Sequence, residues 1–171
     1  MKVTSMEEYG LRCMLQLALP QTDEPIPVSL VAKNEGLSPE YTGKLLNLLR
    51  QAELVDSVRG RNGGFVLARA PENISLADIL RVFSLDLFDV EYCNRFTGIE
   101  DICVHTTSCT LRPVWWMVSG MVSKTLESIS LLDLTCKESE IQRELNVQLS
   151  IKGPVTERLF QINKDQINEN L

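Results

Sequence analysis

The feature that most constrains the fold is a pair of helical segments followed directly by a glycine-rich hairpin. The first segment covers roughly residues 29–34 and is closed by Gly36, a residue suited to the left-handed end of a helix. Ser38 and Pro39 then supply an N-cap and a proline at the first helical position, which predicts a second helix running to about Glu53. Two helices joined by a short turn, the second polar on its outer face, are typical of a helix-turn-helix.

The second helix has an apolar side that we expect to be buried and a polar side. We assign to the buried side Leu45, Leu46, Leu48, Leu49 and Ala52. We expect the other positions to lie mostly elsewhere, namely Tyr41, Thr42, Lys44, Asn47 and Gln51.

The hairpin that follows fits the wing of a winged helix. Residues 54–58 alternate in polarity like a strand, and residues 65–67 form the return strand. The turn between them reads Arg59-Gly60-Arg61-Asn62-Gly63-Gly64, in which glycines let the backbone approach a phosphate and arginines supply charge. A nucleotide-binding loop would need a Gly-Lys-Ser/Thr pattern, which is absent.

The remaining elements surround this unit. A first helix is predicted from a capping box of Ser5 with Glu8, and it stops at Pro20; a short helix opens at Ser75 and ends near Phe83. A helix of roughly 20 residues begins at Leu111 and carries a stripe that suits a coiled-coil-like dimer contact, with an intramolecular core stripe as the alternative. The stripe consists of Leu111, Trp115, Val118, Val122, Leu126 and Ile129.

The sequence therefore predicts a mainly α fold with a small β-wing. We expect a winged helix-turn-helix DNA-binding domain over residues 1–83, a cysteine-bearing loop over 84–110 and a dimerisation helix over 111–135. Residues 136–171 turn polar and are expected to form a peripheral helix or a partly disordered tail.

Charge is unevenly distributed along the 171 residues. The formal net charge is −6, yet residues 41–70 carry five basic and two acidic side chains. Salt screens charges within about 10 Å, so this local basic patch matters more for phosphate contact than the total. The absence of a long apolar run or a signal-peptide pattern indicates a cytoplasmic protein. With a single histidine and no catalytic constellation, we expect no enzyme.

Three of the five cysteines, Cys93, Cys103 and Cys109, lie in the pattern Cys-x9-Cys-x5-Cys. In a cytosolic chain, thiols this close are more often metal ligands than disulfides, and thiolates select iron–sulfur clusters or zinc. Structural zinc usually shows Cys-x2-Cys pairs, which do not occur here. Metal-free cysteines or a thiol–disulfide switch are the alternative. Cys13 lies at an apolar helical position and is expected to be a buried thiol.

With these elements in this order, the chain resembles the Rrf-type winged-helix transcriptional regulators, the family of the IscR-, NsrR- and RirA-like iron–sulfur cluster regulators. The resemblance covers roughly residues 1–135. It is carried by Met1-Lys2-Val3-Thr4 with Tyr9-Gly10-Leu11-Arg12, by Leu37-Ser38-Pro39-Glu40-Tyr41, by Val58-Arg59-Gly60-Arg61-Asn62-Gly63-Gly64-Phe65, and by Cys109-Thr110-Leu111.

The resemblance implies homodimers that bind double-stranded operator DNA, with the second helix of the motif in the major groove and the wing in the minor groove. The implied DNA-binding residues are Ser38, Glu40, Tyr41, Lys44, Arg59, Gly60 and Arg61. Gly43 departs from IscR-like members, which place a larger polar side chain there to read bases.

The resemblance also implies metal ligands, namely Cys93, Cys103 and Cys109, although family members often have five residues in the first gap where this chain has nine. IscR-like proteins place a histidine three residues after the third cysteine; here that position is Arg112, which does not bind iron. The fourth ligand is expected to be Glu8 of the partner subunit, whose competing role is the capping box, or the single histidine, His105.

The function expected from the sequence is that of a homodimeric DNA-binding regulator, a repressor, whose operator binding is controlled by an iron–sulfur cluster. A [2Fe–2S] cluster is favoured over [4Fe–4S], and the signal is redox state, oxygen, nitric oxide or iron status. The alternative is a metal-free or thiol-switched DNA-binding regulator of the same fold.

Overall fold

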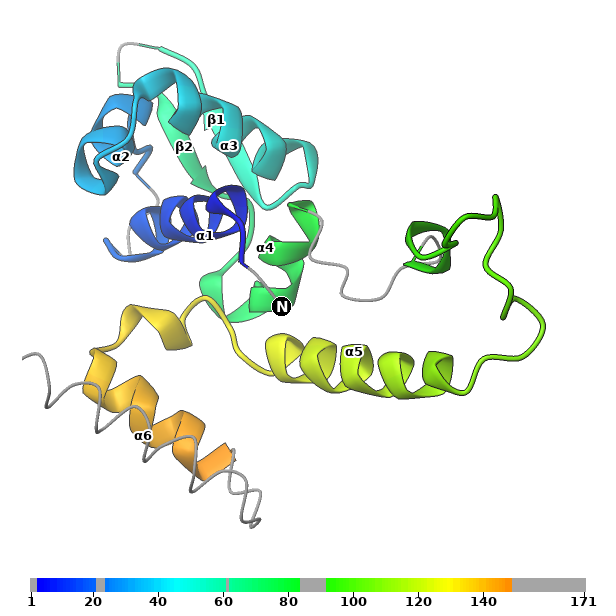
Figure 1. The fold of residues 1–171 in the computed structure, drawn as a ribbon. Coiled ribbons are helices and arrows are strands. Elements are labelled where there is room, and N and C mark those ends of the chain that lie inside the picture. Colours follow the sequence, from blue (N-terminus) through cyan, green and yellow to red (C-terminus); the bar gives the residue numbers. More distant parts are fainter. Residues whose placement is uncertain (1–2, 21–23, 61, 84–91, 149–171) are drawn as a thin grey trace, which may run out of the picture. The chain divides into compact units, whose positions relative to one another are not determined.

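The computed structural model describes residues 3–20, 24–60, 62–83 and 92–148 (Figure 1). The chain divides into two units, Met1–Thr135 and Cys136–Leu171. The first unit holds α1 (Ser5–Ala18), α2 (Val28–Glu35), α3 (Pro39–Gln51), β1 (Val55–Val58), β2 (Gly64–Leu67), the 3-10 turn η1 (Pro71–Asn73), α4 (Leu76–Val82), η2 (Tyr92–Arg95), α5 (Leu111–Glu127) and η3 (Asp133–Thr135). The second unit holds α6 (Glu138–Gln148).

The core of the first unit lies where α1, α2 and α3 pack on one another and on the hairpin. Its fully buried side chains include Cys13, Met14, Leu45, Leu46 and Leu49. The predicted fold class, mainly helical with a two-stranded antiparallel wing, is confirmed.

The buried face of α3 differs from the prediction at two positions. Leu45, Leu46 and Leu49 are buried as expected, but Thr42 is also completely buried, because it lies three, four and seven residues before them on the same helical face. Ala52 is exposed, since α3 ends at Gln51 and leaves Ala52 as the C-cap.

The start of α1 also differs from the prediction, by one residue. The capping box is formed by Thr4 and Glu7: Thr4 Oγ1 accepts from the Glu7 amide at 3.4 Å, and the Glu7 carboxylate accepts from the Thr4 amide at 2.6 Å. Glu7 is buried and Glu8 is exposed. The prediction that Ser5 and Glu8 form the box is therefore wrong, and Glu8 has no capping role.

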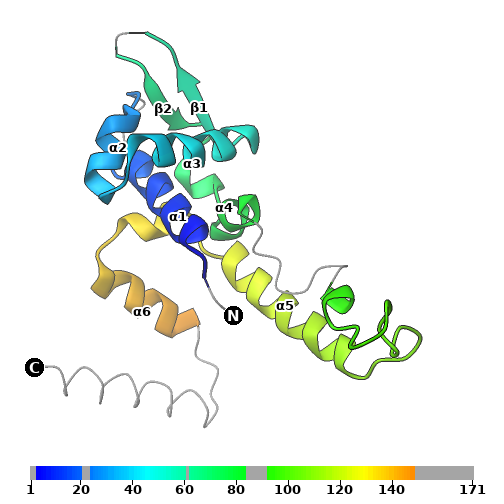
Figure 2. The ribbon, with the colours of Figure 1, turned by 45° about the horizontal axis from the view of Figure 1, so that its top comes forward.

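The wing is the β1–β2 hairpin, which projects beyond α2 and α3 in Figures 1 and 2. Near the turn end of the strands, Ile26 joins the hairpin through two backbone hydrogen bonds of 2.9 Å with Phe65. A Cβ atom on Gly64 would lie 2.3 Å from the Ile26 carbonyl oxygen, so only glycine fits there. Gly60, in the turn, has a φ of +124°, which side-chain-bearing residues rarely adopt.

Helix α5 is fastened to the rest of the unit at its C-terminal end. Ser75 caps α4 as predicted, and the chain leaving α5 pairs with the segment before α4. The Leu76 amide donates to the Ile129 carbonyl at 2.8 Å, and the Leu131 amide donates to the Ile74 carbonyl at 2.7 Å. Ile129 lies beyond the end of the helix and is buried, so it does not belong to the predicted helical stripe.

The second unit begins the predicted polar tail with α6, at whose start the Lys137 amide donates to the Glu140 carboxylate at 3.2 Å. The rest of the tail, residues 149–171, lies outside the described residues. None of the described helices has the length and apolar character needed to cross a membrane.

Candidate DNA-binding surface and thiol-lined hollow

The outer face of α3 exposes the polar side chains that the sequence assigned to DNA. Ser38, Glu40 and Lys44 are all exposed. Ser38 is also the N-cap, because its Oγ accepts from the Tyr41 amide at 3.2 Å. Gly43 lies on the same side, and the nearest atom to a Cβ built there is Val28 Cγ1 at 3.9 Å, so open space surrounds it.

Tyr41 has a packing role that the sequence did not indicate. Its ring is half-buried and meets the Tyr9 ring of α1 edge-on, with 6.2 Å between the ring centroids. In the wing, Arg59 and Gly60 are exposed, whereas the prediction for Arg61 lies outside the described residues.

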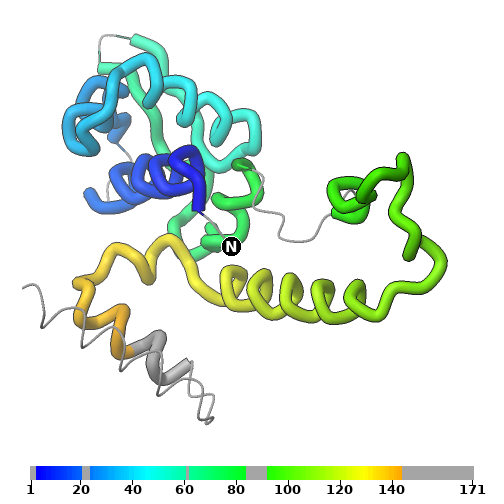
Figure 3. Tube along the Cα trace, in the orientation of Figure 1, coloured from blue at the N-terminus to red at the C-terminus, as the bar shows by residue number. Residues whose placement is uncertain are grey.

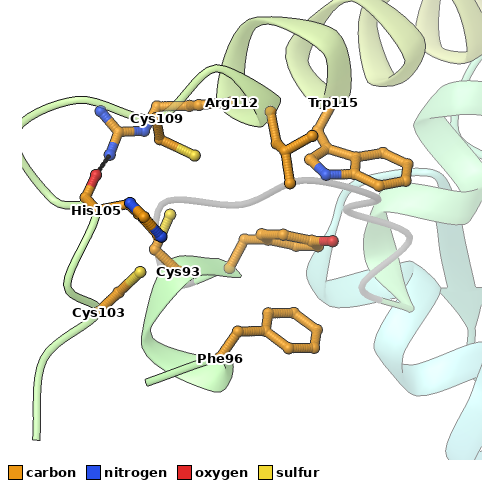
Figure 4. Close-up of a pocket in the computed structure, with 9 residues that line it drawn as sticks. Cys93, Phe96, Cys103, His105, Cys109, Arg112 and Trp115 are labelled. Atoms are coloured by element: carbon orange, nitrogen blue, oxygen red, sulfur yellow. Dashed lines mark hydrogen bonds between the residues drawn. The ribbon is translucent and has the colours of Figure 1, made fainter. Parts of the chain in front are cut away.

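The three cysteines of the predicted metal site line one hollow of about 360 Å³ at the N-terminal end of α5 (Figure 4). Its walls consist of Tyr92, Cys93, Phe96, Cys103, His105, Cys109, Leu111, Arg112 and Trp115. Cys93, Cys103 and Cys109 are half-buried free thiols, so the soft donors that an iron–sulfur cluster requires gather around one space.

Short turns and a helix start position these thiols. Cys93 lies in η2 and its carbonyl accepts from the Phe96 amide at 3.2 Å; Cys103 opens a second turn, in which its carbonyl accepts from the Thr106 amide at 3.2 Å. Cys109 stands two residues before α5. Within the described part of the chain, no three His, Cys, Asp or Glu side chains are close enough to hold a metal ion together. The donor set and the hollow fit a thiolate-bound group, while the thiols would have to draw together to ligate one.

The two candidates for a fourth ligand lie in different places. His105 lines the hollow with the cysteines. Glu8 is not among the hollow's lining in its own chain; it lies on α1, where its carboxylate accepts from Arg12 Nε at 2.8 Å. Arg12 also approaches the Glu35 carboxylate at 3.9 Å.

Aromatic rings form the apolar side of the hollow. The Tyr92 ring centroid lies 5.0 Å from that of Phe96 and 6.2 Å from that of Trp115. Phe96 and Trp115 are themselves exposed in the single chain, so the hollow is open to solvent.

Arg112 lines the hollow, a placement that sequence reasoning missed. Sequence reasoning excluded it as a ligand and gave it no other function. The signal was its nearness in sequence: Arg112 follows Cys109 by only three residues, so its side chain starts close to that thiol.

Cys13 is confirmed as a buried thiol remote from this hollow. Burial, and to a smaller extent the Glu35 carboxylate, raises the pKa of the Cys13 thiol to about 12. Because the thiolate is the form that binds metals and reacts, Cys13 has a structural role.

Comparison with known proteins identifies the family. The model of the Rrf2 family, described as an iron-dependent transcriptional regulator, matches residues 3–137. The chain is 32% identical over 143 residues to the HTH-type transcriptional regulator IscR of Aliivibrio salmonicida, covering 84% of this chain and 82% of that protein. It is 32% identical over 148 residues to the regulator NsrR of Halalkalibacterium halodurans, covering 86% and 99%.

A solved structure agrees with these sequence relatives. The structure of CymR, the global cysteine regulator of B. subtilis, matches with a TM-score of 0.64 and 30% identity, over 79% of this chain and 96% of that one. The chain therefore belongs to the Rrf2 family of DNA-binding winged-helix transcriptional regulators.

Proposed function

We propose that this chain is a homodimeric transcriptional repressor whose affinity for its operator is controlled by an iron–sulfur cluster, a [2Fe–2S] cluster rather than [4Fe–4S]. The observation that carries the proposal is the hollow at the start of α5, around which Cys93, Cys103 and Cys109 gather. The relatives named IscR and NsrR support a regulator of this kind.

For DNA contact, we assign α3 to the major groove and the wing to the minor groove. Glu40 and Lys44 are exposed on α3, with Ser38 and Tyr41 beside them. A carboxylate accepts from cytosine N4 and an ammonium donates to guanine, so this pair can read base edges. The residues Arg59, Gly60 and Arg61 of the wing are assigned to the phosphate backbone and the minor groove.

A second copy of the chain is the proposed partner of α5. No side chain of this 17-residue helix is buried within one chain, although Val114, Trp115 and Met117 are among its exposed apolar residues. A helix that is apolar on most of its surface requires a covering partner. Pairing two copies along α5 would cover this surface. It would also present two DNA-binding heads, each made of α1–α4 and the wing, to the two half-sites of an operator.

For the cluster, we assign Cys93, Cys103 and Cys109 as ligands. The fourth ligand is Glu8 of the partner subunit, with His105 as the alternative. The choice of Glu8 is supported by the start of α1, where Thr4 and Glu7 form the capping box and Glu8 takes no part in it. An exposed carboxylate held by a single exposed arginine can leave that arginine at small cost, since such pairs contribute about 0–1 kcal/mol.

When bound, a cluster supplies a centre whose charge and integrity respond to redox state, oxygen, nitric oxide or iron. The residues of the chain convert that response into a change of DNA affinity. Cys109 and α5 are adjacent in sequence, and the far end of α5 is bonded to the segment before α4 in the DNA-binding head. Drawing the thiols together would therefore shift α5 relative to the head. The free energy of operator binding would then differ between the cluster-bound and the cluster-free protein.

The test is anaerobic purification followed by iron and sulfide analysis and an ultraviolet–visible spectrum of wild type, Cys103→Ala and Cys109→Ala. Cys136→Ala is the matched control, because it removes an exposed thiol outside the hollow. We expect visible absorption and stoichiometric iron and sulfide in wild type and in the control, and their loss in the two loop variants. Operator affinity would then be measured with and without the cluster.

A colourless wild-type protein would favour the second candidate, a metal-free or thiol-switched regulator. That candidate is supported by the similarity to CymR, named a cysteine regulator, and by the separation of the thiols in the described chain. It predicts that oxidation of the cysteines, rather than iron, changes operator affinity.

A further inference from the structure

The first turn of α5 lacks the features that usually stabilise the start of a helix. Thr110 precedes the helix without giving a side-chain cap, and the first turn has no acidic residue. It contains Arg112, although a positive charge near a helix N-terminus is unfavourable with respect to the helix dipole. Such a local conflict is typical of a position kept for function.

The contacts of Arg112 show what it does. Its Nη2 donates to the Thr106 carbonyl at 3.0 Å. The same nitrogen donates to the His105 carbonyl at 3.3 Å (Figure 4). Both carbonyls belong to the turn that Cys103 opens. Arg112 thereby connects the Cys103 turn to the helix that begins after Cys109, and it brings two of the three thiol-bearing segments together.

Arg112 also lines the hollow itself. Arg112 is part of the same lining as the three cysteines, whereas Glu100 and Asp101, the acidic residues in the described part of the loop, are exposed and not part of it. An arginine stays positively charged at all physiological pH values, and the two N–H donors on one nitrogen of its planar fork can bond two backbone oxygens at once. A centre bound by thiolates is negatively charged, so a fixed cation at this place stabilises it.

We propose that Arg112 is the positioning residue of the thiol site: it holds the Cys103 turn against the start of α5 and provides the positive charge beside the bound centre. This inference rests on the proposed function, because it concerns the same hollow. Arg112 is not itself a ligand. It affects the affinity of the thiols for a metal and the reduction potential of the loaded centre.

Binding of Co²⁺ alone to the metal-free, reduced protein tests the positioning role. Thiolate-to-cobalt absorption would be titrated in wild type, Arg112→Ala, Arg112→Lys and the control Lys124→Ala, which removes one exposed positive charge from the other end of α5. We expect Arg112→Ala to weaken Co²⁺ binding by about 10-fold or more, in line with the loss of other outer-shell partners, and Lys124→Ala to leave it unchanged. Arg112→Lys keeps the charge without the fork and should fall between them.

Two further measurements separate this role from a general loss of structure. Hydrogen exchange of residues 103–110 in the metal-free protein should accelerate in Arg112→Ala and Arg112→Lys, while exchange in α1 to α4 stays as in wild type. In protein loaded with iron and sulfide, the reduction potential should fall in Arg112→Ala and stay near the wild-type value in Arg112→Lys, because loss of a positive charge makes uptake of an electron harder.

The outcomes distinguish this inference from the proposed function. Wild-type Co²⁺ binding that Arg112→Ala retains in full, with unchanged loop exchange, would overturn the role of Arg112 alone. Absence of both Co²⁺ and iron binding in the wild-type protein would overturn the metal site and this inference with it. Weakened binding with a lowered potential in Arg112→Ala would establish both parts of the role.

Discussion

At the residue scale, Gly10 and Gly43 are two mid-helix glycines with opposite surroundings. A Cβ atom at Gly10 would lie 2.1 Å from Cε2 of the buried Phe83 ring, so α1 depends on the missing side chain to approach α4. A Cβ atom at Gly43 would meet nothing nearer than 3.9 Å. The same substitution should therefore change the free energy of unfolding in opposite directions.

We predict that Gly10→Ala lowers the free energy of unfolding by about 1–2 kcal/mol, because overpacking outweighs the gain in helix propensity. Gly43→Ala should raise it by up to about 1 kcal/mol, since propensity acts there without a clash. Urea unfolding of the two variants beside wild type measures both effects. Equal stability changes in the two variants would contradict this account of Gly10.

The start of α1 and the burial of Thr42 are two features that the sequence alone did not decide. Thr4 and Ser5 are both good N-caps, and each has a glutamate three residues later, so the sequence allows two capping boxes. The choice depends on which glutamate the core buries, and only packing shows that it is Glu7. Thr42 was misplaced for a similar reason, because its hydroxyl suggested the polar face while its position on the helix decides its burial.

At the scale of elements, α5 is the part of the chain that a single copy leaves least covered. The spacing of apolar residues predicted this helix and its stripe, and Trp115 and Val118 are indeed exposed in one chain. The spacing could not predict where the helix ends. Ile129 continues the period, yet the chain turns after Glu127 to pair with the segment before α4.

We predict that Val118→Asp dissociates the proposed dimer, raising its dissociation constant by at least about 10-fold. Burying an unpaired carboxylate costs more than the roughly 1.4 kcal/mol that corresponds to a tenfold change. The monomer should stay folded, because Val118 is exposed in the single chain. Sedimentation equilibrium over a range of concentrations measures association, and circular dichroism monitors the fold.

Lys124→Asp is the control for this experiment, since helical spacing places it away from the Val118 stripe. If Val118→Asp associates as tightly as wild type, or if wild type is monomeric at all concentrations, α5 is not the dimer contact.

At the scale of the whole molecule, the fold of the DNA-binding head was readable from the sequence and the geometry of the cysteine loop was not. The head consists of elements with local signals, such as the Ser38-Pro39 helix start and the glycines of the wing. In the loop, the spacing of Cys93, Cys103 and Cys109 predicted that the thiols would lie close together; among the described residues they line one hollow but are not close enough to hold a metal ion. The closure of the Cys103 turn onto Arg112 depends on backbone carbonyls, which leave no pattern in a sequence.

The whole molecule is also the scale at which the proposed metal loading would be coupled to DNA binding. Figure 3 traces α5 from the loop of residues 92–110 at one end to the DNA-binding head at the other. At the head, Arg81 bonds Ser123 at 3.2 Å and forms an ion pair with Glu127. In the proposed mechanism, a shift of α5 would reach α4 through this junction.

We predict that Glu127→Gln reduces the ratio of operator affinities between metal-loaded and metal-free protein, by up to about fivefold, because an exposed ion pair contributes at most about 1 kcal/mol. Co²⁺ affinity should stay at the wild-type value, since Glu127 is remote from the hollow. The measurement is fluorescence anisotropy of a labelled operator duplex with each form of the protein. Glu72→Gln, which removes an exposed carboxylate of the head away from Arg81 and α5, is the control and should leave the ratio unchanged. An unchanged ratio in Glu127→Gln would mean that the coupling passes through the backbone pairing of residues 74–76 with 129–131 instead.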